Sequence, residues 1–256
     1  MNRQLLIQCG RGHIMEKIAV VIGAGPVEGI GGALALRAAA AGCHVIVTGR
    51  TESRIEALAE HLRDQGGQAT AKVLDTTVET EVEDLFAAVD GMDGALEFVG
   101  YNAGNSFRHD TLTMSGDFFE KAWRVCCFGG FLVGREAGRR MAERGAGTIM
   151  FTGATASVKS RPPFMAFASG KFGLRAVASA LARELGPKGV HVGHAIIDGG
   201  IDGERLNERN PDAKAARGEN GMLKPEAIAE AYWQLHLQHP SAWSFEIDLR
   251  PFKETF

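Results

Sequence analysis

The stretch KIAVVIGAGPVEGIGGALALRAAAAG, residues 17–42, decides the fold. It opens with a short β-branched run that ends in glycines, which is typical of a buried strand. An alanine-rich segment follows and stops at Gly42, as a helix would. The stretch therefore predicts a strand that passes into a helix through a glycine-rich turn.

Strands and helices alternate along the rest of the chain. Strand patterns stand at residues 44–50, 68–75, 95–104, 147–155, 189–200 and 244–251. Helix patterns stand at 51–67, 78–90, 115–145, within 162–189 and at 225–238, with 115–145 as one long helix. Several strands are apolar throughout, which favours a parallel sheet covered on both faces. The sequence thus predicts an α/β fold, a single doubly wound, Rossmann-type parallel sheet of seven strands with helices on both faces.

The composition is that of a globular protein, with 45% hydrophobic and 23% charged residues among 256. A net charge of -3 provides no broad basic field for nucleic acid or an anionic membrane. No apolar run is long enough to cross a bilayer. The four cysteines have no zinc-binding spacing, so we expect reduced thiols and no metal site. These features favour a cytoplasmic protein.

The N-terminal residues 1–14 stand apart from this pattern. They lack the apolar core and cleavage site of a secretory signal, and Met15 directly precedes the first strand. We expect residues 1–14 to be a disordered extension and residues 15–256 to form one nucleotide-binding domain.

The glycine turn has the spacing of a phosphate-binding loop. Gly25, Gly29 and Gly31 form a G-x-x-x-G-x-G pattern, with Gly23 before them and Ile30 between them. Glycines permit a tight turn and let a diphosphate approach the backbone, and the following helix N-terminus supplies N–H donors. A glycine turn with a packing role only is the alternative. Its position between first strand and first helix favours nucleotide binding.

Residues at the ends of the next two strands indicate which nicotinamide cofactor the chain binds. Arg50 follows Gly49, where an NAD-binding fold usually carries a carboxylate for the ribose hydroxyls. An arginine suits a 2′-phosphate, which favours NADP(H) over NAD(H). Asp75 could accept from the adenine amino group, or it could cap the helix that starts shortly after it.

At this point the chain resembles the short-chain dehydrogenase/reductase family. The resemblance rests on GAGPVEGIG in the first turn, on Asn102, Ala103 and Gly104 after the fourth strand, and on Lys171 in the helix after the fifth. It implies hydride transfer between a nicotinamide cofactor and a carbonyl or alcohol. It also implies that Asn102–Gly104 line the cofactor and that Lys171 contacts the nicotinamide ribose.

The catalytic pattern of that family is only partly present. The family uses a tyrosine as proton donor, a serine that orients the carbonyl, and an asparagine in the preceding helix. Phe167 stands at the tyrosine position, Ala154 at the serine position and Cys126 at the asparagine position. Thr155, one residue out of register, could orient a carbonyl, and Asp198 could act as a base near the nicotinamide. Lys171 could itself donate a proton.

Other polar side chains are weaker candidates to replace the tyrosine. Tyr101 precedes the asparagine of the fourth strand, and Tyr232 lies in the C-terminal helix. Ser157 and Ser169 are aliphatic hydroxyls, which are poor acids near neutral pH. His109 could reach a substrate, or it could be a solvated loop histidine.

Two functions from different classes remain open. The first is an NADP(H)-dependent oxidoreductase of variant mechanism, acting on a small apolar carbonyl or alcohol under a polar lid at residues 196–223. The second is a catalytically silent NADP(H)-binding sensor or scaffold. A non-redox reaction ranks last, because the glycine loop is retained. The resemblance also implies a homo-dimer or homo-tetramer, with Trp233 and Trp243 as interface anchors or core residues.

Overall fold

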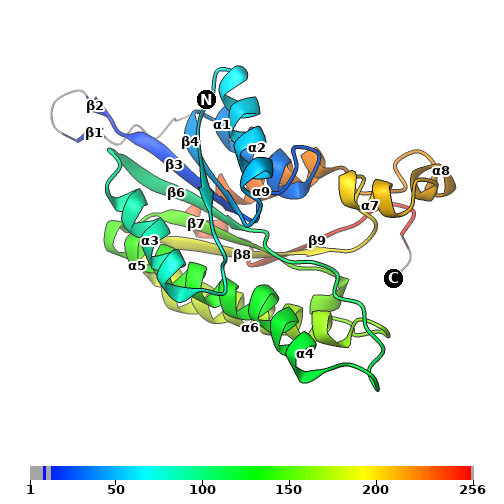
Figure 1. The fold of residues 1–256 in the computed structure, drawn as a ribbon. Helices are drawn as coiled ribbons and strands as arrows, with labels where there is room; N and C mark the ends of the chain where they lie inside the picture. The colour runs from blue at the N-terminus through cyan, green and yellow to red at the C-terminus, as the bar shows by residue number, and fades with distance from the viewer. Residues whose placement is uncertain (1–7, 10–12, 255–256) are drawn as a thin grey trace.

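The computed structural model describes residues 8–9 and 13–254. Its main sheet has seven strands in the order β5-β4-β3-β6-β7-β8-β9, and every neighbouring pair is parallel. These strands are β3 (Glu16–Ile22), β4 (Cys43–Gly49), β5 (Gln68–Val73), β6 (Gly94–Tyr101), β7 (Gly147–Thr152), β8 (Val190–Ile197) and β9 (Glu246–Leu249). The predicted seven-stranded parallel sheet is confirmed, and Figure 1 shows its twist.

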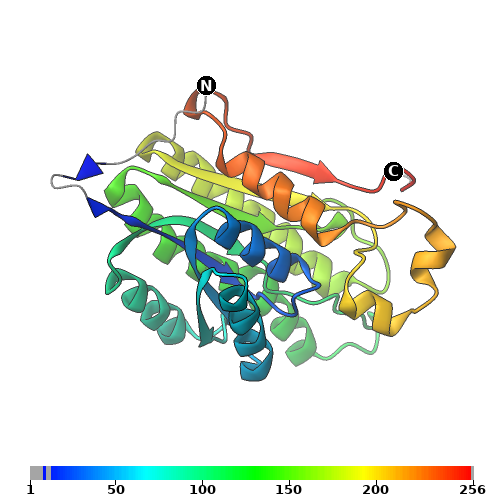
Figure 2. The same cartoon turned by 90° about the horizontal axis from the view of Figure 1, so that it is seen from above.

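Helices cover both faces of the sheet, as the apolar strands predicted. They are α1 (Ile30–Ala40), α2 (Glu52–Asp64), α3 (Glu79–Asp90), α4 (Gly116–Trp123), α5 (Gly129–Arg144), α6 (Met165–Leu185), α7 (Glu204–Arg209), α8 (Ala213–Arg217) and α9 (Pro225–His236). Figures 1 and 2 show α1, α2 and α9 on one face and α3, α5 and α6 on the other. Strand order reverses between β3 and β6, so the carboxyl ends of these strands open a crevice for a ligand.

Each face of the sheet buries its own hydrophobic core. Val21, Leu34 and Tyr232 belong to the core under α1, α2 and α9, whereas Val20, Phe86 and Leu174 belong to the core under α3, α5 and α6. Trp233 is buried in the first core, 5.5 Å from the ring of Phe98, so it is a core residue of this chain rather than an exposed interface anchor.

The predicted single helix over 115–145 is wrong in one detail. A π-helical turn at Arg124–Phe128 separates α4 from α5. The Gly129 N–H donates to the Arg124 carbonyl, one residue further back than in an α-helix, and the skipped Val125 carbonyl accepts from the Tyr101 hydroxyl at 2.6 Å. The tertiary hydrogen bond thus compensates the interrupted helical pattern.

The N-terminal extension lies mostly outside the described residues. Gln8–Cys9 and His13–Ile14 form a short antiparallel pair, β1 with β2. The expected disorder of residues 1–14 stays a prediction. In the part of the chain that the structure describes, no helix is long and apolar enough to cross a membrane. Over the same residues, no group of three or more His, Cys, Asp or Glu side chains is arranged to hold a metal ion.

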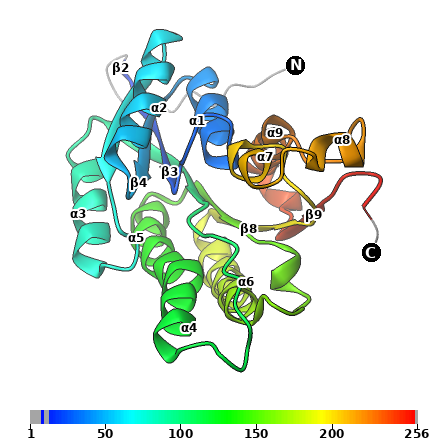
Figure 3. The same ribbon diagram turned by 45° about the vertical axis from the view of Figure 1, so that its right-hand side comes forward.

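The segment after β8 forms a lid over the carboxyl ends of the strands. It carries the short helices α7 and α8, which Figure 3 shows beside α9 and β9. Gly203 approaches the glycine turn so closely that a Cβ on it would lie 2.6 Å from the Glu28 carbonyl oxygen. The lid therefore lies directly against the turn that the sequence assigned to a nucleotide.

Candidate functional site

A cavity of about 1070 Å³ opens at the carboxyl ends of the parallel strands. It is lined by the turns after β3, β4, β5, β6 and β7, by the start of α6 and by the lid. Small-molecule sites span roughly 300–1,000 Å³, so this one lies at the upper end of that range. A cavity is therefore present where the strand order reverses, and it is large enough for a ligand of dinucleotide size.

The glycine turn forms the floor of this cavity. Gly23, Gly25, Gly29 and Ile30 all line it. Gly25 has a φ of +68°, a backbone conformation that favours glycine, and a Cβ on it would meet no atom within 4 Å. Gly29 is the residue before α1, so the free N–H groups at the start of this helix lie at the cavity. The turn thus presents backbone donors to open space.

Gly31 has a different role from its neighbours. It does not line the cavity, and a Cβ on it would lie 2.4 Å from the Ala24 carbonyl oxygen. Its lack of a side chain lets α1 pack against the turn. The third glycine of the pattern therefore supports the site from behind.

The residues after β6 hold the glycine turn in place. The Asn102 side chain donates to the Gly23 carbonyl at 3.0 Å, and the Asn102 N–H donates to the Ile22 carbonyl at 2.8 Å. Ala103 packs against Gly23 so tightly that a Cβ on the glycine would lie 2.6 Å from the alanine Cα. Asn102, Ala103 and Gly104 all line the cavity, next to the turn as expected.

Arg50 and Asp75 lie together at the far end of the cavity, after β4 and β5. Arg50 is exposed, and its guanidinium has no carboxylate partner among the residues that the structure describes. One carboxylate oxygen of Asp75 accepts from the Thr77 N–H at 2.9 Å and from its hydroxyl at 2.8 Å. Asp75 therefore stabilises the turn that leads to α3, while it still lines the cavity.

Lys171 lies at the opposite end, buried beneath the cavity wall. It is only 4% exposed, and its ammonium group donates to the Thr152 carbonyl at 2.7 Å. The Phe167 ring lies one turn earlier, with its centroid 5.8 Å from Nζ, and both side chains line the cavity. Burial lowers the pKa of Lys171, and the nearby Cys126 thiol opposes that shift. The other two N–H groups of the Lys171 ammonium can therefore donate to a ligand, in an environment largely shielded from water.

Thr155 and Asp198 form a bonded pair, but only one of them lines the cavity. The Thr155 hydroxyl donates to the Asp198 carboxylate at 2.5 Å, and Arg250 forms an ion pair with the same carboxylate at 3.3 Å. Thr155 lines the cavity, whereas Asp198 lies behind it. Asp198 can therefore act on a ligand only through Thr155.

The family of the chain follows from comparison with known proteins. A family model described as short chain dehydrogenase matches residues 17–214. The chain belongs to the short-chain dehydrogenase family. The resemblance seen in the sequence is thereby confirmed.

Relatives of this short-chain dehydrogenase span most of its length. A solved short-chain dehydrogenase from Rhodopseudomonas palustris is 39% identical, covers 93% of this chain and 99% of its own, and has a TM-score of 0.78. The 3-oxoacyl-[acyl-carrier-protein] reductase of Rickettsia bellii is 29% identical over 81% of this chain and 84% of its own. A gluconate 5-dehydrogenase from Burkholderia cenocepacia, solved with NADP and tartrate, is 22% identical, covers 92% and 94% of the two chains, and has a TM-score of 0.79.

Both tyrosines of this short-chain dehydrogenase are fully buried away from the cavity. Tyr101 donates to the π turn, and Tyr232 donates to the Thr152 hydroxyl at 3.0 Å. Burial raises the pKa of both phenols. His109 does not line the cavity either; its ring packs 4.9 Å from that of Phe118.

The sequence analysis missed the side chains by which the lid contacts the site. Arg205 of α7 donates to the Gly104 carbonyl, and Arg209 donates to the Ser106 hydroxyl, each at 3.3 Å. Arg54 of α2 forms an ion pair with Glu204 at 3.5 Å. The polar composition of residues 196–223 indicated a lid, but it did not indicate which of its side chains point toward the cavity.

Proposed function

We propose that the protein is an oxidoreductase that transfers a hydride between NADP(H) and a carbonyl or alcohol by a variant mechanism. One observation carries the proposal. The glycine turn, with its free backbone donors, and the buried Lys171 open on the same cavity. A protein that only packed a glycine-rich turn would not need a buried ammonium at the other end of the same cavity.

The residues present fit a nicotinamide dinucleotide. Gly25 and Ile30 would hold the diphosphate with backbone N–H groups. The Gly29 N–H donates to the Pro26 carbonyl at 3.1 Å, so Gly29 would contribute space beside the diphosphate, and Asn102 would keep that turn in shape. Arg50 would bind the 2′-phosphate of NADP(H), which is the basis for preferring it to NAD(H). Asp75 remains within reach of the adenine end. Relatives of the same fold that were solved with NADP, such as the Burkholderia cenocepacia enzyme, support this assignment.

The proton must come from a group other than a phenol. Phe167 stands where the family has tyrosine, and Ala154 and Cys126 stand at the serine and asparagine positions. When bound, the nicotinamide supplies or accepts the hydride. We assign the proton to Lys171, whose lowered pKa makes its ammonium a better acid than an exposed lysine. Thr155 is a positioning residue: its hydroxyl donates to Asp198, which fixes its orientation, so its oxygen can accept a hydrogen bond from the hydroxyl of the alcohol.

A catalytically silent NADP(H)-binding sensor or scaffold is the second candidate. It is favoured by the environment of Lys171. One of the ammonium hydrogens is committed to a main-chain carbonyl, and the nearest ring, Phe167, has no ionisable group. The cavity would then bind the nucleotide without turning over a substrate.

The first experiment is a titration with NADPH and then NADH, followed by nucleotide and tryptophan fluorescence. We expect NADPH to bind more tightly, and Arg50→Ala to remove most of the difference. Arg183→Ala is the matched control, because Arg183 also lacks a carboxylate partner and does not line the cavity. Lack of binding of either nucleotide would refute both candidate functions.

A carbonyl screen with NADPH then separates the two candidates. NADPH oxidation that depends on an added carbonyl, and that falls at least tenfold in Lys171→Met with NADPH binding retained, supports the enzyme. Tight binding with no turnover on any carbonyl supports the sensor. Lys188→Met, an exposed lysine outside the cavity lining and outside the lid, is the control for loss of a charge.

We also propose a cytoplasmic homo-dimer or homo-tetramer. Trp123, Phe131 and Phe172 keep 37–43% of their surface exposed along α4, α5 and α6. An apolar stripe on neighbouring helices is a common interface feature. Sedimentation of the wild type and of Phe131→Glu tests the assembly; a wild-type monomer would contradict it.

A further inference from the structure

The cavity lining is strongly cationic although the chain is slightly acidic. Nine basic and three acidic side chains line the cavity, whereas the net charge of the whole chain is -3. Positive charge is thus concentrated at the cavity. A concave surface of one sign focuses the electrostatic potential and attracts ligands of the opposite sign.

The proposed cofactor accounts for only part of this charge. Arg50 and Arg54 lie at the 2′-phosphate end, and Lys171 lies at the ribose. Lys121 of α4 also lines the cavity. Five further cations line the rest of it, two from the loop after β7 and three from the lid: Lys159, Arg161, Arg205, Arg209 and Arg217. They come from segments far apart in the chain that converge on the same opening.

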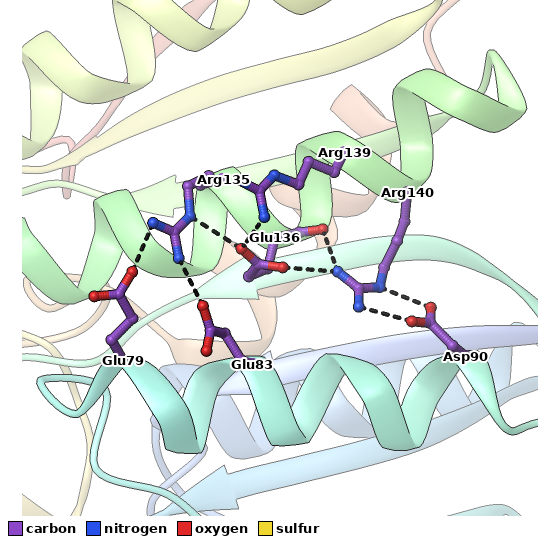
Figure 4. A network of polar contacts seen from close by, with 7 residues as sticks. All are labelled: Glu79, Glu83, Asp90, Arg135, Glu136, Arg139 and Arg140. Atoms are coloured by element: carbon purple, nitrogen blue, oxygen red, sulfur yellow. Dashed lines mark hydrogen bonds and ion pairs between the residues drawn. The ribbon is translucent and has the colours of Figure 1, made fainter.

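These five cations have no carboxylate partner in the described part of the chain. Arg205, Arg209 and Arg217 donate only to neutral oxygens, the carbonyls of Gly104 and Ala213 and the Ser106 hydroxyl. Three arginines of α5 behave differently. Figure 4 shows Arg135, Arg139 and Arg140 of α5 bound to the carboxylates of Glu136, Glu79, Glu83 and Asp90. The charge at the cavity is therefore left uncompensated.

Apolar side chains line the same cavity as these cations and Lys171. Phe107, Phe164, Phe167 and Leu206 line the cavity together with Pro162. An apolar wall beside cations matches a ligand with an apolar stem and a charged end. Such a ligand can place its carbonyl near Lys171 while its anionic group remains at the opening.

We propose that the substrate is an anionic carbonyl or alcohol, a carboxylate or phosphate on an apolar stem, bound at its charged end by Arg161, Arg209 and their cationic neighbours. This inference rests on the proposed function and narrows its substrate class. The wholly apolar substrate expected from the sequence would leave these side chains without a ligand.

The test is a binding experiment on the protein saturated with NADP⁺, so it does not require turnover. Calorimetry compares 6-oxoheptanoate with its methyl ester, and hydroxyacetone phosphate with hydroxyacetone. We expect at least one anion to bind about tenfold or more tightly than its neutral analogue, with an affinity that falls as salt is raised. The pair in which the anion gains more affinity over its neutral analogue shows whether the site prefers a carboxylate or a phosphate.

Two variants assign the binding to the cavity. Arg161→Gln and Arg209→Gln should each weaken anion binding about threefold to tenfold and leave the neutral analogue unchanged, because both side chains are exposed and partly screened. Arg161 makes no side-chain hydrogen bond to any residue that the structure describes, so its removal leaves the described lid contacts intact. Arg183→Gln, outside the cavity, is the matched control.

The outcomes separate this inference from the proposed function. Failure of NADP⁺ to bind contradicts the function itself. If NADP⁺ binds but neither anion does, or the acid and the ester bind alike, the inference is overturned and the function stands. Anion binding that both cavity variants leave unchanged overturns it as well.

Discussion

Replacing Gly25 by alanine should weaken NADPH binding far more than it weakens the fold. Gly25 and Gly42 both have positive φ, +68° and +82°, and a Cβ on either would meet no atom within 4 Å. Alanine in this conformation costs about 1 kcal/mol at either site. Only Gly25 lines the cavity. There a methyl group would displace the diphosphate from backbone donors, and each such bond to a charged group contributes about 1.5–3 kcal/mol.

Gly42→Ala is therefore the control for backbone strain. Urea unfolding followed by tryptophan fluorescence should give the same loss, about 1 kcal/mol, for Gly25→Ala and Gly42→Ala. NADPH titration should separate them, with an affinity about ten- to hundredfold lower for Gly25→Ala and unchanged for Gly42→Ala. Wild-type affinity in Gly25→Ala, or an equal loss in both variants, would refute the assignment of the turn to the diphosphate.

Three further predictions concern the acid, the core and pH. Phe167→Tyr should raise kcat/KM for carbonyl reduction about 10²-fold, since a phenol would then lie beside the ammonium; no gain in a steady-state assay contradicts this. Glu136→Gln should lower the free energy of unfolding by about 3 kcal/mol, because three arginines lose a buried partner, whereas the exposed Glu143→Gln on the same helix should not. Burial lowers the pKa of His194 and His236 from 6.5 to about 4, so both are neutral in the native state and protonation favours unfolding. Each histidine should lower the free energy of unfolding by about 3 kcal/mol as pH falls from 6.5 to 4. Urea unfolding that gave the same free energy at pH 7 and pH 5 would contradict this.

The sheet and the cofactor turn could be predicted because their signals are local. β3 is a run rich in β-branched residues, and the glycine spacing after it marked the turn; the φ of +68° at Gly25 is a finding of the structure. The resemblance to the family supplied Lys171 and Asn102, and both line the cavity; their contacts with a cofactor stay a prediction. Local sequence therefore predicted the glycine turn, whereas Lys171 was predicted from the resemblance.

The features that sequence could not predict depend on contacts between distant residues. The π turn is completed by Tyr101, 24 residues away from Val125. The lid contact between Arg205 and Gly104 spans 101 residues. Periodicity carries no information on such pairs. Asp198 was expected at the nicotinamide, but the direction of its side chain depends on Thr155 and Arg250, which only the folded chain brings together.

The anchor of Lys171 has a consequence for how such a site can change over time. Its ammonium is held by the main-chain carbonyl of Thr152, and the hydroxyl of the same residue accepts from Tyr232 on the opposite face of the sheet. Every residue type has a main-chain carbonyl, so no substitution at position 152 can remove it. The lysine can keep its place while neighbouring side chains are exchanged one at a time. A chain built in this way can lose a phenol and still present a positioned ammonium, from which new chemistry can be selected.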